Sequence, residues 1–321
     1  MKKFLLSVGI VLSLGILAAC GNTTSGTTDS SETASSTSSS TSAGTIKVTD
    51  TNGTVEVPQN PEKVVVFDMG SLDTIDALGA GDAVVGTAVS NLPAYLDAYA
   101  DVESAGGIKE PDIEAINAMA PDLIIISGRQ ADYLDQLSAI APTIYLGIDY
   151  ENTWDSIQDN VKTLGQIFEK EDEAESQLAE LQTQIDEVHT QATDDGKNAL
   201  VLLANEGELS AYGAGSRFGI IHDTFGFSEA DDAIEASTHG QSVSFEYVLE
   251  TNPDIIFVVD RTQAIGGDDS QNNVAENELV QQTTAGQNNL VIMLDPEVWY
   301  LSGGGLESVQ LMIDDVKQAF Q

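Results

Sequence analysis

Two stretches of the chain repeat the same order of polar and apolar positions, 132 residues apart. Residues 113–129 (IEAINAMAPDLIIISGR) align without a gap with residues 245–261 (FEYVLETNPDIIFVVDR), so that Arg129 aligns with Arg261. Each copy predicts a short helix, a Pro-Asp turn and an apolar strand of the kind that is buried in a parallel sheet. Pro-Asp is common turn chemistry, but that explanation does not account for the aligned arginines. The repeat therefore predicts two related α/β lobes.

The region between the two copies has the period of an amphipathic helix. Residues 151–192 are rich in Glu, Gln, Leu and Ala and contain no proline. Asn152 and Thr153 offer an N-terminal cap, and a break is expected between residues 169 and 172. A helical region of this length predicts a stiff bridge between the lobes. Its apolar residues recur three to four positions apart: Trp154, Ile157, Val161, Leu164, Leu178, Leu181, Ile185 and Val188.

The folded body is predicted to begin with a β-hairpin. Alternating apolar residues flank Asn52-Gly53 between residues 45 and 57, and this dipeptide in such a setting is a strong turn signal. A strand over residues 63–67 follows. The expected boundaries are an N-terminal α/β lobe at 45–150, the connecting helical region at 151–192 and a C-terminal α/β lobe at 193–321.

The amino terminus has the pattern of an export signal. A short basic head precedes an apolar stretch over residues 4–17, which is too short for a stable membrane-spanning helix. The closing Leu-Ala-Ala-Cys resembles the bacterial lipobox, which predicts a signal peptide over residues 1–19 and a lipid on the sulfur of Cys20. Because stable anchoring takes two acyl chains, we expect a diacylated or triacylated Cys20 at the outer face of a membrane. The alternative is an ordinary secretory peptide with an incidental thiol.

The segment after Cys20 has the composition of a flexible tether. Residues 21–44 contain 16 serines and threonines in 24 positions and almost no apolar side chains. Such a segment cannot bury enough surface to offset the loss of chain entropy on folding. We therefore expect residues 20–44 to hold the folded body loosely on its anchor. Cys20 is the only cysteine, so the chain forms no internal disulfide.

The chain is strongly acidic, yet it places three arginines in similar settings. It has 52 carboxylates and a formal net charge of −40. Arg129, Arg217 and Arg261 each follow an apolar or glycine-rich run that predicts a strand entering a loop. The planar fork of a guanidinium grips an anion where a hydrated ammonium does not. The shared setting predicts a common anionic ligand, and an ordinary ion pair for each arginine is the alternative.

Several segments that are weak signals singly are specific in their order and spacing. They are the opening hairpin and residues 66–79 (VFDMGSLDTIDALG), 91–96 (NLPAYL), 216–223 (SRFGIIHD), 238–240 (THG) and 295–308 (DPEVWYLSGGGLES). With them the chain resembles the class III substrate-binding lipoproteins of bacterial iron-uptake ABC transporters, and within these the catecholate-type siderophore binders related to the petrobactin-binding proteins. The resemblance covers nearly all of residues 45–321.

The resemblance implies a fold and a ligand. The class III periplasmic-binding-protein fold has two Rossmann-like α/β lobes joined by a long rigid helix, with a cleft between them. Arg129, Arg217 and Arg261 match the arginines that line this cleft and hold an anionic ferric siderophore, and no cofactor is implied. His239 and Tyr300 match positions that can complete the coordination of Fe(III) when the siderophore supplies four donors. The alternatives are a hydrogen-bonded turn histidine and a packed aromatic ring.

The resemblance also implies partners. Glu114 and Glu246, which align in the internal repeat, match acidic residues that dock onto arginines of an ABC permease, one on each lobe. The alternative is a solvated glutamate favoured by the dipole at the start of a helix. A monomer attached to the membrane through lipidated Cys20 is expected.

Other function classes fit the sequence poorly. No G-x-S-x-G elbow or P-loop is present, so an enzyme is not expected. Three dispersed histidines do not predict a zinc or manganese site, and an acidic chain without a basic stripe does not predict nucleic-acid binding. The interpretations left open are a binding protein for a hydroxamate siderophore, haem or a corrinoid, and a surface adhesion or structural lipoprotein.

Overall fold

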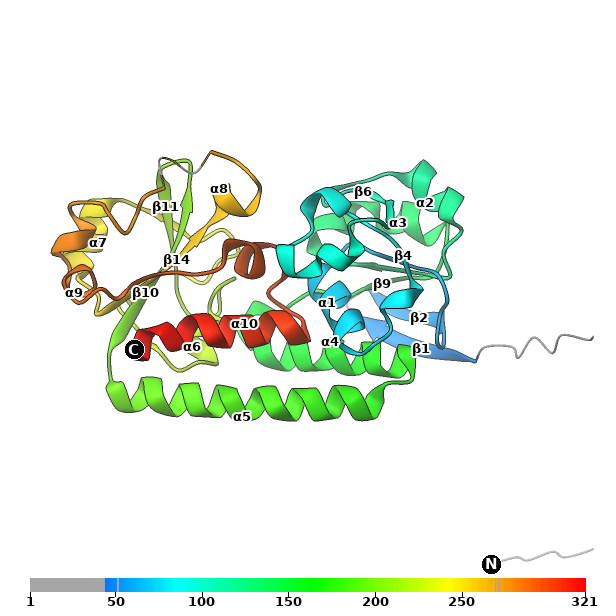
Figure 1. The fold of residues 1–321 in the computed structure, drawn as a ribbon, viewed down its shortest axis with the longest axis horizontal. Coiled ribbons are helices and arrows are strands. Elements are labelled where there is room, and N and C mark those ends of the chain that lie inside the picture. Colours follow the sequence, from blue (N-terminus) through cyan, green and yellow to red (C-terminus); the bar gives the residue numbers. More distant parts are fainter. Residues whose placement is uncertain (1–43, 51, 269, 271) are drawn as a thin grey trace, which may run out of the picture. The chain divides into compact units, whose positions relative to one another are not determined.

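The protein is described here by a computed structural model that covers residues 44–321 except 51, 269 and 271. The predicted signal peptide, Cys20 and nearly all of the Ser/Thr-rich segment lie outside these residues. The described residues belong to one unit, Ser42–Gln321. It contains two large sheets with helices around them and two small two-stranded sheets, β1-β2 and β6-β7, the latter formed by Gly106–Gly107 and Glu110–Pro111 (Figure 1). Among the described residues, no helix has both the length and the apolarity needed to cross a bilayer.

The sheet of the N-terminal lobe is parallel throughout, as the sequence pattern predicts. Its central strands, β3 and β8, are buried at every residue, which explains why their sequences are apolar without alternation. The strand order is β5-β4-β3-β8-β9, with bounds Glu103–Ser104, Val84–Thr87, Val64–Val66, Leu123–Ile126 and Thr143–Tyr145. The helices of this lobe are α1 (Met69–Ala77), α2 (Ile113–Met119) and α3 (Leu134–Ser138).

The predicted opening hairpin is confirmed. β1 (Thr45–Asp50) and β2 (Gly53–Pro58) pair antiparallel, with Asp50 opposite Gly53. Asp50 also accepts a hydrogen bond from the backbone N–H of Tyr145 (2.8 Å), at the end of β9. The hairpin is therefore fastened to the N-terminal sheet.

The sheet of the C-terminal lobe is mixed, which differs from a purely parallel Rossmann-like lobe. β10 pairs parallel with β14 but antiparallel with β11, because Glu206 and Gly207 turn the chain back with φ of 52° and 86°. The strand order is β13-β11-β10-β14-β15, with β12 beside β10. The bounds are β10 Asn198–Asn205, β11 Glu208–Tyr212, β12 Ser228–Glu229, β13 Gln241–Val243, β14 Ile255–Asp260 and β15 Val291–Met293. The helices include α6 (Ile220–Asp223), α7 (Phe245–Thr251), α8 (Arg261–Ala264) and α9 (Thr284–Gln287).

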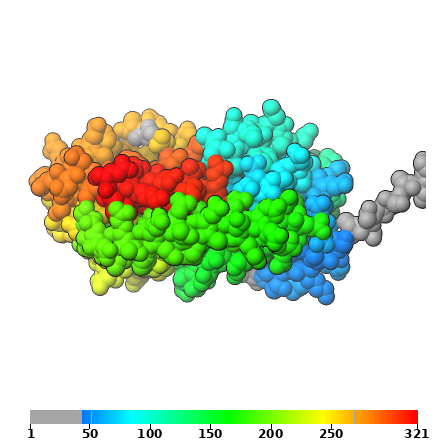
Figure 2. Space-filling view, turned by 60° about the horizontal axis from the view of Figure 1, so that its bottom comes forward, coloured from blue at the N-terminus to red at the C-terminus, as the bar shows by residue number. Residues whose placement is uncertain are grey.

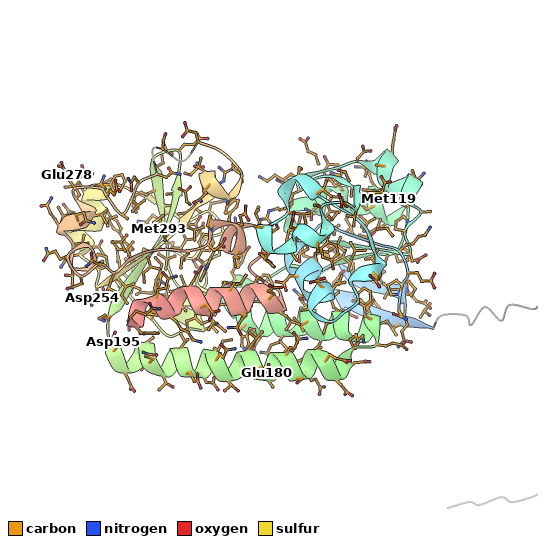
Figure 3. All side chains as sticks on the ribbon, in the orientation of Figure 1. Met119, Glu180, Asp195, Asp254, Glu278 and Met293 are labelled. Carbon is orange, nitrogen blue, oxygen red and sulfur yellow. The ribbon has the colours of Figure 1, made fainter. Side chains whose placement is uncertain are left out.

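The Pro-Asp turns of the internal repeat perform the same task in both lobes. Asp122 precedes β8 and accepts a hydrogen bond from the backbone N–H of Lys63 (3.0 Å), just before β3. Asp254, labelled in Figure 3, precedes β14 and accepts one from the backbone N–H of Asn198 (3.2 Å), at the start of β10. Each aspartate therefore ties its own strand to the parallel strand beside it.

Two helices, not one, connect the sheets. α4 (Thr153–Phe168) ends at Glu169, whose left-handed conformation (φ 55°) reverses the chain into α5 (Glu171–Asp195). The break lies where the sequence places it, and α5 runs along both lobes (Figure 1). Figure 2 shows α4, α5 and the C-terminal helix α10 (Leu306–Val316) as a continuous layer. One apolar cluster runs through this layer, with Ile157 of α4, Leu181 of α5 and Ile313 of α10 among its members.

The N-terminus of α10 is held by a carboxylate from the other lobe. Asp73 of α1, which is fully buried, accepts hydrogen bonds from the backbone N–H groups of Glu307 and Ser308, both at 2.7 Å. α1 approaches so closely that a Cβ on Gly70 would lie 2.9 Å from the backbone of Gly304. Asp73 therefore replaces the cap that Gly305, which has no side chain, does not supply.

Below about pH 5, where the pKa shift of Asp73 does not oppose folding, replacing Asp73 by alanine should lower the free energy of unfolding by about 2 kcal/mol, because the N–H groups of Glu307 and Ser308 lose their acceptor. Urea unfolding measures this change. The matched control is Asp97→Ala, which removes an exposed carboxylate and should cost less than about 0.5 kcal/mol. Equal stability of the two variants would contradict the capping role.

The same variant tests a pH dependence. Burial raises the pKa of Asp73 to about 6, above the value of about 3.9 in an unfolded chain. The folded protein thus binds the Asp73 proton more tightly than the unfolded chain does. The stability that comes from this tighter binding is fully present below about pH 4 and is lost as the pH rises through about 6. The free energy of unfolding should fall between about pH 4 and pH 6 in the unaltered protein, and this fall should be absent in Asp73→Ala.

Candidate ligand-binding site

A cavity of about 500 Å³ lies beyond the carboxyl ends of β3, β8 and β9. Ligands of open α/β sheets bind at this end of the strands. The N-terminal lobe supplies Asp68 after β3, Arg129 after β8 and Tyr145 at the end of β9. The rest of the wall comes from Lys109, Ser127, Gly128, Leu146, Gly147, Ile148, Tyr150, Arg217, Thr238, His239 and residues 299–303.

The two aligned arginines follow equivalent strands. Arg129 lies in η4 (Gly128–Tyr133), close behind β8, and Arg261 is the first residue of α8, directly behind β14. Both therefore begin short helices instead of lying in loops. Arg217 reaches the same place from the loop after β11. Strand ends that are far apart in the sequence thus bring three guanidinium groups together.

Tyr300 is the residue on which all three arginines meet. It lies in η7 (Val298–Ser302), the short coil between the two lobes in Figure 1. Its backbone carbonyl accepts hydrogen bonds from Nη2 of Arg129 (2.6 Å) and Nη2 of Arg217 (2.7 Å). Its hydroxyl accepts one from Nε of Arg261 (2.9 Å). The guanidinium of Arg217 also lies 4.2 Å from the centre of the phenol ring, within cation–π range.

None of the three arginines forms an ion pair with a carboxylate among the described residues, although the charge of Asp68 acts on Arg129. Within the part of the chain that the structure describes, the ion pairs no longer than 4.0 Å involve Lys170, Lys197 and Lys317 and no arginine. Burial lowers the pKa of Arg129, and the neighbouring charge of Arg217 lowers it further. Two cations held this close repel each other, so an anion between them would relieve the repulsion.

Tyr300 is also adapted to carry negative charge. Burial opposes ionisation of its phenol, but the hydrogen bond from Arg261 and the charges of Arg217, Arg261 and Arg129 outweigh burial and lower the pKa. Stabilising the ionised form makes the phenol oxygen a better donor to a hard cation such as Fe(III).

His239 lines the same cavity from an exposed turn. Its backbone N–H donates to Oγ of Ser237 (3.1 Å). The turn continues through Gly240 with φ of 72°, where a Cβ would lie 2.7 Å from the ring of Tyr212. His239 and Tyr300 therefore border one space. Among the described residues, no group of three or more His, Cys, Asp or Glu is arranged to hold a metal ion.

Arg261 differs from the other predicted ligand-binding residues in its place at the site. It is not among the residues that line the cavity, and it contacts Tyr300 and Asn205 instead. Four lining residues with an ionisable side chain are not predicted as site residues by the sequence: Asp68, Lys109, Tyr145 and Tyr150. Asp68 had a usable signal, because it follows the buried strand β3 at the end where ligands bind.

The two glutamates of the internal repeat are exposed and occupy the same place in their helices. Glu114 is in the first turn of α2 and Glu246 is in the first turn of α7. Hydrogen bonds to its own backbone N–H and to the Ser244 side chain lower the pKa of Glu246. α2 and α7 lie in different lobes, far apart in Figure 1.

The model of the periplasmic binding protein family matches residues 64–298, well over half of the chain. The chain belongs to this family. It is 47% identical over 327 residues, covering all of both chains, to the petrobactin-binding protein YclQ of Bacillus subtilis. The crystal structure of YclQ superposes with a TM-score of 0.85 over 87% of this chain and 99% of that chain.

Two further members of the family support the same assignment. The ferric-anguibactin-binding protein FatB of Vibrio anguillarum is 33% identical over 84% of this chain and 85% of FatB. The crystal structure of the periplasmic catecholate-siderophore binding protein VctP from Vibrio cholerae is 33% identical, with a TM-score of 0.81 over 86% of this chain and 100% of that chain. These matches confirm the predicted class III fold. The family consists of substrate-binding proteins and is not an enzyme family.

Proposed function

We propose that this protein captures an anionic ferric siderophore of the catecholate type in the cavity and delivers it to an ABC permease for iron uptake. The observation that carries the proposal is the convergence of Arg129, Arg217 and Arg261 on Tyr300 with no carboxylate partner within 4.0 Å among the described residues. The names of YclQ, FatB and VctP support it, because each is named for a siderophore or a siderophore class.

Attraction must act locally, because the protein as a whole repels an anion. The formal net charge is −40, but salt screens such charges beyond about 10 Å. A guanidinium–anion contact at about 4 Å, with an effective dielectric near 20, contributes about 4 kcal/mol before desolvation. Arg129 and Arg217, both in the cavity wall, are placed to supply this local attraction.

Titration of the purified body with a ferric tris-catecholate and a ferric hydroxamate tests the ligand class. Trp299 lies in the cavity wall, so quenching of tryptophan fluorescence should report binding. We expect tight, saturable quenching by the catecholate complex. Binding of the hydroxamate complex alone would instead favour a neutral ligand and overturn the proposed class.

His239 and Tyr300 are proposed to supply donors to Fe(III) when the siderophore offers four donors. His239→Ala and Tyr300→Phe should then weaken binding of a ferric bis-catecholate by about tenfold each, because that complex leaves coordination sites open. Binding of a ferric tris-catecholate, which fills all sites, should be unaffected. Equal losses for both complexes in the fluorescence titration would show that the two residues only shape the cavity.

We also propose how the protein is placed in the cell. The predicted lipid on Cys20 would anchor a monomer at the outer face of the cytoplasmic membrane, with the Ser/Thr-rich segment as tether. Lipoproteins among the relatives support this placement. Mass spectrometry of the mature N-terminus would test it, since an unmodified thiol at Cys20 would contradict the anchor.

Docking on the permease is proposed to use Glu114 and Glu246. Both are exposed, and one comes from each lobe. Neither lines the ligand cavity, so capture and delivery would use different surfaces.

A further inference from the structure

Asn205 ends β10 beside the first residue of α8, and strand register fixes this position. β10 and β14 are parallel neighbours in which Ala204 pairs with Asp260, so the residues that follow, Asn205 and Arg261, lie side by side. Arg261 donates from Nη1 to Oδ1 of Asn205 (2.5 Å) and from Nε to the hydroxyl of Tyr300 (2.9 Å). One guanidinium therefore connects the end of β10 to the phenol in the site.

The turn after Asn205 is fastened to the same end of the sheet. The backbone N–H of Glu206 donates to Oγ1 of Thr262 (2.9 Å), the neighbour of Arg261. The next N–H, of Gly207, donates to Oδ1 of the buried Asn272 (2.7 Å). Asn205 thus lies between the paired strand β10 and a fastened turn, so it offers Arg261 a fixed acceptor.

The carboxylate nearest in sequence to Arg261 is engaged elsewhere. Asp260 is only 4% exposed and accepts hydrogen bonds from Nδ2 of Asn272 (2.8 Å) and the backbone N–H of Gln263 (3.0 Å). The partners of Arg261 are therefore a neutral amide and a phenol. An amide orients the guanidinium without cancelling its charge, whereas a carboxylate in its place would do both.

We propose that Asn205 is a positioning residue for iron binding. It fixes the guanidinium of Arg261, and Arg261 in turn holds the Tyr300 hydroxyl at the place where a protein oxygen completes the coordination of a ferric bis-catecholate. This inference rests on the proposed iron contact of Tyr300. Arg261 then acts through Tyr300 and does not contact the ligand, in agreement with the absence of Arg261 from the cavity wall. Groups that orient a metal ligand in this way typically affect metal affinity by about 10–100-fold.

The test compares two probes in the full folded body. One is the ferric complex of a bis-catecholamide built on diaminopentane, and the other is that of a tris-catecholamide built on tris(aminoethyl)amine. Asn205→Leu removes the acceptor at similar volume and should weaken binding of the bis-catecholate by about tenfold, with the tris-catecholate unchanged. The visible charge-transfer band of the bound bis-catecholate should shift as it does in Tyr300→Phe, and the double variant should lose no more than Tyr300→Phe alone.

Asn205→Asp is the conservative control. It keeps the acceptor that orients Arg261 but adds a charge that opposes it, so both affinities should fall, and the bis-catecholate should lose less relative to the tris-catecholate than it does in Asn205→Leu. Asn205→Ala gives the same comparison if leucine prevents folding, which thermal unfolding will show. An unchanged bis-catecholate affinity and band in both Asn205→Leu and Asn205→Ala, with Tyr300→Phe impaired, would overturn the role of Asn205 alone. Normal bis-catecholate binding by Tyr300→Phe would overturn the proposed iron contact and this inference with it. The proposed binding function would still stand in that case, provided that the unaltered protein captures both probes.

Discussion

Replacing Arg129 and Arg217 together by alanine is expected to weaken binding of an anionic ferric catecholate by about 1,000-fold. Both guanidinium groups line the cavity and donate to the Tyr300 carbonyl, so both are placed to bind one anion. A hydrogen bond to a charged group contributes about 1.5–3 kcal/mol, and each 1.4 kcal/mol is a factor of about ten in affinity. Fluorescence titration measures the loss, and circular dichroism checks that the fold persists.

Two further variants separate geometry from charge. Arg129→Lys with Arg217→Lys keeps both charges but loses the planar fork, so a loss of about tenfold is expected. Lys170→Ala with Lys197→Ala removes the same charge from lysines that do not line the cavity and should leave affinity unchanged. Affinity equal to that of the unaltered protein in the double alanine variant would exclude this cavity as the anion site.

Replacing Glu114 and Glu246 together by alanine should nearly abolish siderophore-dependent iron uptake in cells while leaving ligand affinity unchanged. The two carboxylates are exposed on α2 and α7, outside the cavity. Charge pairs across an interface are each worth about 1.5 kcal/mol or more when close, so losing one on each lobe should weaken docking strongly. Uptake of radioactive iron, with affinity measured on the same purified variant, separates delivery from capture.

The control pair lies on α5. Glu175 and Glu180 are exposed, and Glu180 is labelled on this helix in Figure 3. Their replacement by alanine removes the same charge, so uptake should stay normal. Normal uptake by the Glu114 and Glu246 variant, at equal expression, would leave these residues as solvated glutamates at helix starts.

The sequence predicted the strands best where burial acts on every position. β8 and β14 are apolar without alternation because both faces are covered, and the Pro-Asp turns before them recur because each aspartate ties two strands. The antiparallel course of β11 could not be read in the same way. It depends on a two-residue turn at Glu206 and Gly207, and Glu206 is an uncommon residue with positive φ.

The charges of the candidate site could be predicted from the sequence, but the hydrogen-bond partners of its residues could not. Three arginines in an acidic chain indicate an anion, but their common partner is the backbone carbonyl of Tyr300, and a carbonyl has no sequence signature. Asn205 was invisible for a related reason. Its role follows from the parallel register of β10 and β14, which is known only once the sheet is formed.

The Asp73 contact with α10 limits how the protein can respond to its ligand. Besides the connection through α4 and α5, the lobes are joined by α10, whose first turn is held by Asp73. A wide hinge rotation would pull this carboxylate from both N–H groups, at a cost of about 1–3 kcal/mol for a group left buried and unpaired, such as that of Ser308. Loaded and unloaded forms should therefore be nearly superimposable. Under the proposed function, the permease would then have to recognise the bound complex itself or a small shift near η7, and it would have to supply the free energy that separates the lobes.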